Sequence, residues 1–213
     1  NKKDISKSKN DTKKNSIVYI PDANFKKYLI ENKKINTNGD NEIQQSEAES
    51  FKGSLYDGGI SASGKGIKDL TGIESFTALT VLKCSMNQLT SLDISKNTAL
   101  NTLYCDMNPL TSLDVSRNTT LTLLNCIDCG LTSLDVSKNT ALSVLNCGLN
   151  ELTSLDVSKN IALTELFCSY NQLSSLDVSK NISLTSLDCG YNQLNCVTGV
   201  PDDCKLEGAK RCD

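Results

Sequence analysis

Apolar residues recur along this chain with a period of 21 residues, from position 79 to position 199. Each unit has two similar halves, LxxLxCxxN and LxxLDVSxN, in which apolar residues alternate over three positions. Such alternation is typical of a short strand with one buried face. A fixed period of this length predicts a solenoid, whose coils bury their apolar sides against neighbouring coils. The leucines that begin successive units are Leu79, Leu100, Leu121, Leu142, Leu163 and Leu184.

Each half of the unit ends in an asparagine, which we expect to turn inward and to hydrogen-bond to backbone groups at the bend. Stacking the coils then produces two asparagine ladders. The first ladder consists of Asn87, Asn108, Asn150, Asn171 and Asn192, and the second of Asn97, Asn118, Asn139, Asn160 and Asn181. The pattern predicts short parallel strands on both broad sides of the array, little helix, and about 4.8 Å between adjacent coils.

A helical segment precedes the repeats. Its first helix carries three apolar or aromatic residues spaced for one face, namely Phe25, Tyr28 and Leu29. A second short helix is expected over 46–52, with Ser46 as its cap and Glu49 three positions later.

The loop between these helices, residues 36–47, matches an EF-hand calcium loop in outline. Its candidate ligands are Asn36, Asn38, Asp40, Glu42 and Glu47. An asparagine replaces the usual first aspartate, which weakens the attraction for a hard dication. Two interpretations stay open, a weak Ca²⁺ site and a structural relic that keeps the helix–loop–helix shape, and we favour the relic. We expect no other cofactor.

These patterns divide the chain into five segments. They are a disordered Lys-rich tether (1–16), an EF-hand-like helical cap (17–52), a degenerate repeat (53–78), the regular repeats (79–199) and a carboxy-terminal cap (200–213). In the degenerate repeat Ile60 corresponds to Leu82, at an offset of 22 residues instead of 21.

Cysteine takes the place of an inward leucine once per coil, and we expect these thiols to be buried and reduced. They are Cys84, Cys105, Cys126, Cys147, Cys168 and Cys189. Cys129 forms a CxxC with Cys126 but occupies an asparagine-ladder position, so a ladder defect is favoured over a redox or zinc site. Cys196, Cys204 and Cys212 lie outside the repeat, and we expect Cys196–Cys204 as a disulfide, although other pairings stay open.

The outward positions of the two halves differ in how much they vary between units. The second half repeats nearly unchanged, which favours a soluble outer face over a Ca²⁺- or glycan-binding strip. The first half varies and combines apolar and aromatic residues with carboxylates, as recognition surfaces do. Its candidate ligand-binding residues are Met86, Tyr104, Met107, Leu123, Ile127, Leu149, Glu165, Phe167, Tyr170, Asp188 and Tyr191. Self-association through the same patch is the alternative.

Composition and charge narrow the functional classes. The sequence contains no histidine, which removes the usual general base and any catalytic triad, so we expect no enzyme. Residues 1–16 hold six lysines and two aspartates, so the rest of the chain is more acidic than the net charge of -3 suggests. This balance gives no reason to expect nucleic-acid binding. No apolar run approaches the roughly 20 residues of a membrane span.

Residues 21–199 resemble bacterial surface leucine-rich-repeat proteins related to internalins, in the segments IPDANFKKYLIENKKINTNGDNEI, IKDLTGIESFTALTVLKC and LTSLDVSKNTAL. The LTSLDVSKN repeat is similar to that of exported lipoproteins of Gram-negative gut bacteria. The resemblance implies a β-rich α/β solenoid, a right-handed leucine-rich-repeat superhelix with short parallel strands and an amino-terminal helical cap. It also implies a non-catalytic, exported cell-surface or secreted adhesion protein, with a lipid anchor upstream of Asn1 as one means of attachment. Its partner would be a protein or glycan ligand, with a host-derived ligand as one option.

Overall fold

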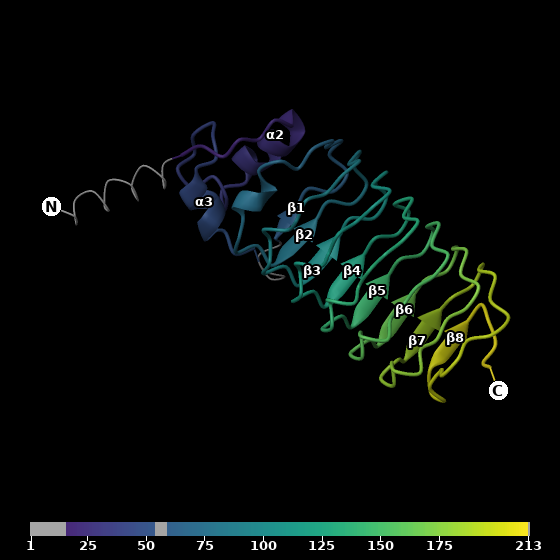
Figure 1. Ribbon diagram of the computed structural model, residues 1–213. Coiled ribbons are helices and arrows are strands. Elements are labelled where there is room, and N and C mark those ends of the chain that lie inside the picture. Colours follow the sequence, from purple (N-terminus) through teal and green to yellow (C-terminus); the bar gives the residue numbers. More distant parts are fainter. Residues whose placement is uncertain (1–15, 54–58, 213) are drawn as a thin grey trace.

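The computed structural model describes residues 16–53 and 59–212, which form an elongated array of coils with helices at its amino-terminal end (Figure 1). The predicted tether lies outside the described residues except for Ser16. Within the described ranges no helix is long and apolar enough to span a bilayer.

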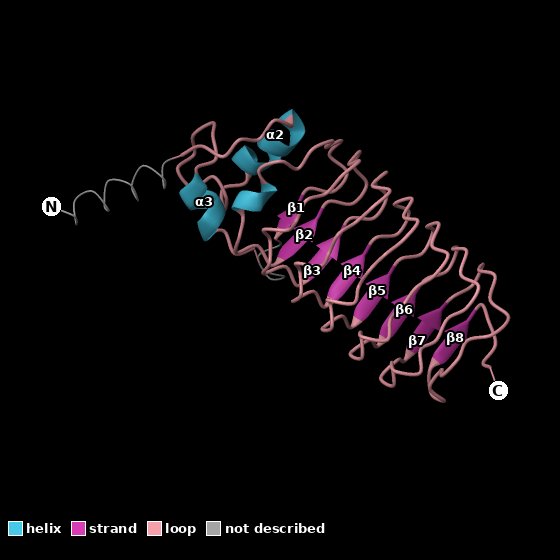
Figure 2. Ribbon diagram, in the orientation of Figure 1, coloured by secondary structure: helices cyan, strands magenta, loops and turns pink. Residues whose placement is uncertain are grey.

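The strands of successive coils form one parallel sheet of eight strands in chain order (Figure 2). They are β1 (Ile60–Ser61), β2 (Val81–Lys83), β3 (Thr102–Tyr104), β4 (Leu123–Asn125), β5 (Val144–Asn146), β6 (Glu165–Phe167), β7 (Ser186–Asp188) and β8 (Lys205–Glu207). From β2 to β7 the central leucine of each strand pairs with the leucine 21 residues later, for example Leu82 with Leu103. Ile60 pairs with Leu82, which confirms the longer offset of the first coil.

The second half of each unit is not a strand, contrary to the prediction, because its backbone groups hydrogen-bond to side chains and within turns instead of to a neighbouring strand. The N–H of Ser95 donates to Oδ1 of Asp93 at 2.9 Å. The carbonyl of Ile94 accepts from the N–H of Asn97 at 3.0 Å and from Nδ2 of Asn118 at 3.0 Å. On this side of the regular repeats, within the described residues, the strand-like pairings are bridges of Asp177 with Thr198 and of Val197 with Arg211.

Both predicted asparagine ladders are present. In the first ladder, Nδ2 of Asn108 donates to the carbonyl of its own Cys105 (2.9 Å) and to that of Cys84 in the preceding coil (3.0 Å). Its Oδ1 accepts from the N–H of Leu89 at 3.1 Å. In the second ladder Nδ2 of Asn139 donates to two carbonyls of the preceding coil, those of Val115 and Asn118, each at 2.9 Å, and its Oδ1 has no partner among the described residues. Each first-ladder asparagine therefore satisfies more of the backbone.

The amino-terminal cap contains helices α2 (Ala23–Glu31) and α3 (Gln45–Ser50), followed by the short 3₁₀ helix η1 (Ile73–Ser75). Phe25 and Leu29 are buried on one face of α2 as predicted, and Tyr28 packs against the core from a partly buried position. The prediction for the second helix is wrong in its cap. Gln44 is the N-cap and Glu47 is its capping-box partner, because the Glu47 carboxylate accepts the N–H of Gln44 at 3.0 Å.

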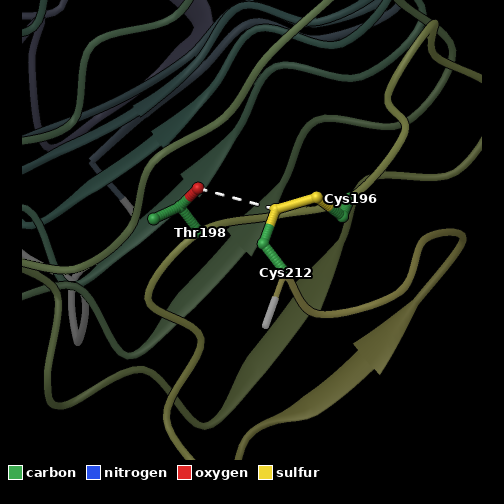
Figure 3. The surroundings of a disulfide bond; sticks show 3 residues. All are labelled: Cys196, Thr198 and Cys212. Carbon is green, nitrogen blue, oxygen red and sulfur yellow. Dashed lines mark hydrogen bonds between the residues drawn. A yellow bond between two sulfur atoms is a disulfide. The ribbon is translucent and has the colours of Figure 1, made fainter.

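The carboxy-terminal segment extends the sheet, since β8 pairs with β7 and closes the end of the core. The disulfide joins Cys196 to Cys212, with 5.1 Å between their Cα atoms, so the predicted Cys196–Cys204 pairing is wrong (Figure 3). Backbone pairing explains the difference, because the N–H of Cys212 donates to the carbonyl of Val197 at 2.9 Å. Cys204 is instead a buried free thiol next to β8.

The six cysteines that recur once per coil are all buried and free, as predicted. They line the interior beside the leucines, in one continuous core with the cap residues Phe25 and Leu29. Burial raises the pKa of these thiols, as at Cys147, where desolvation is the main cause.

Candidate functional site

The predicted ligand-binding residues lie on the outer face of the parallel sheet and on the turn that follows each strand. We call this surface the strand side. The residues on or next to the strands are partly buried, namely Tyr104, Leu123, Ile127, Glu165, Phe167 and Asp188. The residues on the turns are exposed, namely Met86, Met107, Leu149, Tyr170 and Tyr191. The regular stacking of coils therefore brings all of the predicted residues to one side of the molecule.

The five exposed residues share a left-handed backbone conformation that the apolar pattern of the repeat does not predict. Together with Asp128, which occupies the same repeat position, they form a row that we call the ridge. The φ angles are 54° at Met86, 55° at Met107, 53° at Asp128, 53° at Leu149, 55° at Tyr170 and 54° at Tyr191. The sheet's hydrogen bonding continues through this position, since the N–H of Met86 donates to the carbonyl of Asp106 at 2.9 Å.

Left-handed geometry is unfavourable for side chains of this type. It costs about 1–2 kcal/mol for an L-residue, and glycine, asparagine and aspartate are the usual occupants. The first coil follows that preference with Gly64, whose φ is 65° and whose N–H donates to the carbonyl of Ser85. In five of the six regular coils the position instead holds methionine, leucine or tyrosine, with exposures from 48% at Met107 to 74% at Tyr191, and Asp128 occupies it in the sixth. Neither backbone preference nor burial favours these residues, so they are candidates for a surface role.

Gly64 is the signal in the sequence from which this geometry could have been recognised. It lies 22 residues before Met86, which is the offset that also relates Ile60 to Leu82. Because glycine at a repeat position indicates left-handed backbone, its replacement by large apolar residues in later coils marks an unusual position.

Aromatic residues gather at the carboxy-terminal end of the strand side. The rings of Tyr170 and Tyr191 are stacked, with 4.1 Å between their centroids and 12° between their planes. A hydrogen bond with Tyr191 raises the pKa of the Tyr170 hydroxyl above its ordinary value. Phe167 in β6 pairs in register with Asp188 in β7, which places an aromatic ring beside a carboxylate.

Carboxylates outnumber amines along the strand side. Its acidic residues are Asp106, Asp128, Glu165, Asp188 and Glu207, and its basic residues are Lys65, Lys83 and Lys205. All three lysines are engaged: Lys205 pairs with Glu207, Nζ of Lys83 lies 5.6 Å from the centre of the Tyr104 ring, and Nζ of Lys65 lies 5.5 Å from that of Tyr28. The surface therefore combines apolar and aromatic area with an excess of negative charge.

The opposite side of the solenoid carries the nearly invariant aspartate and lysine rows. Each aspartate accepts a hydrogen bond from the N–H of the serine two residues on, at 2.8 Å for Asp135 and Ser137. This bond lowers the pKa of the Asp135 carboxyl, with a smaller contribution from Lys138. The same arrangement recurs at Asp93, Asp114, Asp156 and Asp177. These aspartates shape the turn, which favours the interpretation of this side as a soluble outer face.

The candidate calcium loop is closed by hydrogen bonds between its own groups. Oε1 of Glu47 accepts the N–H of Thr37 at 2.7 Å and that of Asn38 at 3.2 Å, and Oε2 accepts the N–H of Gln44. The carboxylate that would be bidentate to a cation is thereby satisfied by backbone donors.

The remaining candidate ligands are engaged in the same way. Asn36 is buried, and its Nδ2 donates to the carbonyls of Ile30 and Asp40 at 3.0 and 2.7 Å. The Asp40 carboxylate accepts the N–H of Glu42 at 2.8 Å, which lowers the pKa of Asp40. Glu42 itself forms an ion pair with Lys26 at 2.7 Å. In the described parts of the chain no three His, Cys, Asp or Glu residues are placed to hold a metal. This bonding favours the structural relic.

Cys129 occupies a first-ladder position, as the repeat phase predicts. Its Sγ donates to the carbonyl of Cys105 at 3.4 Å, the bond that an asparagine amide makes in other coils. A thiol has no acceptor that corresponds to Oδ1 of asparagine, and the backbone of the preceding coil differs from that of the other coils as a result. There the N–H of Leu110 donates to the carbonyl of Asn108, and Thr111 adopts a φ of 58°. The geometry is that of a local ladder defect.

Comparisons with known proteins concern the fold. No family model and no curated protein matches this chain. The solved structure of internalin C2 from Listeria monocytogenes is similar with a TM-score of 0.65 and 18% identity, over 87% of this chain and 91% of that one. The protein LIC12759 from Leptospira interrogans gives a TM-score of 0.58 and 24% identity, over 69% of this chain and 43% of that one. This chain has a leucine-rich-repeat fold.

A third solved structure is the functional domain of InlJ from Listeria monocytogenes, which includes a cysteine ladder. It is 27% identical over 80% of this chain and 56% of that one, with a TM-score of 0.39. This chain covers 56% of the InlJ domain and 43% of the Leptospira protein, so it spans about half the length of these two structures.

Proposed function

We propose that this leucine-rich-repeat protein is a non-catalytic recognition protein that binds a protein or glycan partner through its strand side. The observation that carries the proposal is the ridge, in which large apolar side chains are exposed at left-handed backbone positions. Residues that reduce the stability of the fold and gain no burial are retained where they contact something else. Stacked aromatic rings and half-buried apolar residues beside the ridge are typical of interaction hot spots.

Catalysis has little chemical support on this surface. The sequence contains no histidine, and the recurring thiols are buried with raised pKa values, as at Cys189, whose pKa burial raises to about 11. A thiol that is protonated at neutral pH is a poor nucleophile. We therefore propose a binding role and no enzymatic one.

We propose further that the protein acts outside the cytoplasm, as an exported bacterial surface protein with an adhesive role. The Cys196–Cys212 disulfide supports this location, because disulfides persist in oxidising compartments. The described loop of the cap needs no calcium in this proposal, since its carboxylates are held by backbone donors.

A binding screen with matched variants tests the proposal. The full chain is screened against extracellular host proteins and a glycan array, beside the variant Tyr170→Gly/Tyr191→Gly. Glycine keeps the left-handed backbone that Gly64 adopts, so the substitution removes side chains without disturbing the turn. We expect a ligand that binds the native chain at least about tenfold more tightly than this variant.

The matched control is Ile161→Thr/Ile182→Thr on another side of the solenoid. Both isoleucines are exposed, at 61% and 80%, and Thr98 occupies the equivalent position in an earlier coil. Binding that is lost in this control but kept in the tyrosine variant would contradict the proposal. If no ligand is found and the native chain self-associates through the tyrosines, the alternative of an architectural surface protein replaces it.

A further inference from the structure

The aromatic residues of the protein differ in whether a lysine side chain lies over the ring. Nζ of Lys83 lies 5.6 Å from the centroid of the Tyr104 ring, and Nζ of Lys65 lies 5.5 Å from that of Tyr28. Among residues 16–53 and 59–212 these are the cation–aromatic contacts, and none involves the aromatic rings of the last regular coils. The face of an aromatic ring attracts a cation, more strongly when water is displaced.

Those last coils also place carboxylates around their rings. Phe167 pairs in register with Asp188, and Glu165 lies two residues before Phe167 on the same face of β6. Asp188 lies close enough to the stacked pair to contribute to the raised pKa of Tyr170. We call this group, Glu165, Phe167, Tyr170, Asp188 and Tyr191, the aromatic–acidic end.

The nearest amine on the sheet does not neutralise it. Lys205 in β8 forms an ion pair with Glu207 in the same strand. Glu207 pairs in register with Asp188, so a further carboxylate stands beside the group. The aromatic–acidic end therefore has rings and negative charge without a cation from the described part of the chain.

From this complementarity we infer that the aromatic–acidic end binds lysine or arginine side chains of a basic segment in a partner protein. The inference rests on the proposed function and specifies its partner. A cationic head group would lie over the rings of Phe167 and the tyrosine pair and would donate hydrogen bonds to the carboxylates of Asp188 and Glu165. The contact of Lys83 with Tyr104 is the same interaction made within the chain.

A titration with a fluorescein-labelled hexa-arginine peptide tests the inference on the full chain. Fluorescence anisotropy is recorded for the native protein and for the variants Asp188→Asn and Phe167→Leu. Asparagine keeps an oxygen to accept the N–H of Gly190, as Oδ1 of Asp188 does at 3.1 Å, and leucine keeps the apolar volume of a strand residue. We expect each variant to weaken binding about fivefold or more, because one removes charge and the other removes the ring face.

Asp177→Asn is the matched control for net charge. It removes one negative charge from the opposite side and keeps the acceptor for the N–H of Ser179. We expect this control to change the affinity less than about twofold. Equal weakening by Asp177→Asn and Asp188→Asn would overturn the inference, because binding would then follow net charge. Full affinity in Phe167→Leu, or no binding of hexa-arginine at all, would overturn it as well.

The outcome separates this inference from the proposed function. A ligand that depends on Tyr170 and Tyr191 but is indifferent to Asp188→Asn leaves the recognition role intact and removes the basic partner. A glycan bound at the same end would have that effect. If, in contrast, the ligand binds equally well without both tyrosines, this surface has no recognition role.

Discussion

At the scale of single residues, the two asparagine ladders differ in what each side chain satisfies. Nδ2 of Asn150 donates to three carbonyls, those of Cys126, Cys147 and Gly148, and its Oδ1 accepts from the N–H groups of Cys129 and Leu131. A second-ladder asparagine such as Asn139 makes two bonds through Nδ2, and its Oδ1 is unpartnered within the described residues. Buried backbone groups that lose a partner are costly, so the ladders should contribute unequally.

We therefore predict that Asn150→Ala lowers the free energy of unfolding by about 3 kcal/mol, and that Asn139→Ala lowers it by about 1–2 kcal/mol. Urea unfolding followed by circular dichroism measures both. An equal loss in the two variants would show that the number of hydrogen bonds does not determine the contribution of these residues.

At the scale of elements, alternation predicted the strands of the first half correctly because their outward and inward residues face different surroundings. The second half alternates equally well, yet its aspartate hydrogen-bonds to the N–H of the serine two residues on, which forms a turn. This local competition cannot be read from apolar spacing. The Gln44 cap was not predicted because its capping-box partner, Glu47, also accepts hydrogen bonds from the loop. The left-handed ridge was not predicted because its apolar side chains do not indicate a left-handed backbone.

The aspartate row makes an element-scale prediction about pH. The pKa of Asp135 and its counterparts is lowered in the folded state, so their contribution to stability is present above the unfolded pKa and is lost as the pH falls through the folded pKa. The urea midpoint should therefore fall as the pH falls below about 4.

Replacing Asp114, Asp135 and Asp156 by asparagine keeps an oxygen acceptor for each serine N–H and removes the titrating group. In this triple variant the urea midpoint should depend less on pH between about 5 and about 2. An unchanged pH dependence would assign acid destabilisation to other carboxylates.

The carboxy-terminal coil makes a prediction about covalent structure. Ten cysteines are present in the sequence and eight are free in the structure. Alkylation of the unfolded, non-reduced protein, followed by peptide mass spectrometry, should therefore modify Cys204 and leave Cys196 linked to Cys212. A peptide linking Cys196 to Cys204 would contradict the closure of the array by β8 and its backbone pairing at Val197.

At the scale of the whole molecule, one side of the solenoid repeats for reasons of folding and the other varies. This difference, and which residues lie on the strand side, could be predicted from the sequence, because a 21-residue period determines which positions point outward. The period could not reveal the stacking of Tyr170 on Tyr191, or that no lysine or arginine of the described residues lies over the Phe167 ring, since these depend on contacts between coils. Neither the repeat period nor the fold identifies the binding partner.

The most direct measurement compares stability and binding in the same ridge variant. For Tyr170→Gly/Tyr191→Gly, we predict a free energy of unfolding within about 1 kcal/mol of the native value or above it, because relief of left-handed strain offsets the flexibility of glycine. Affinity for the ligand found in the screen should fall at least about tenfold. A marked loss of stability with unchanged affinity would contradict the account, since the tyrosines would then serve the fold and not recognition.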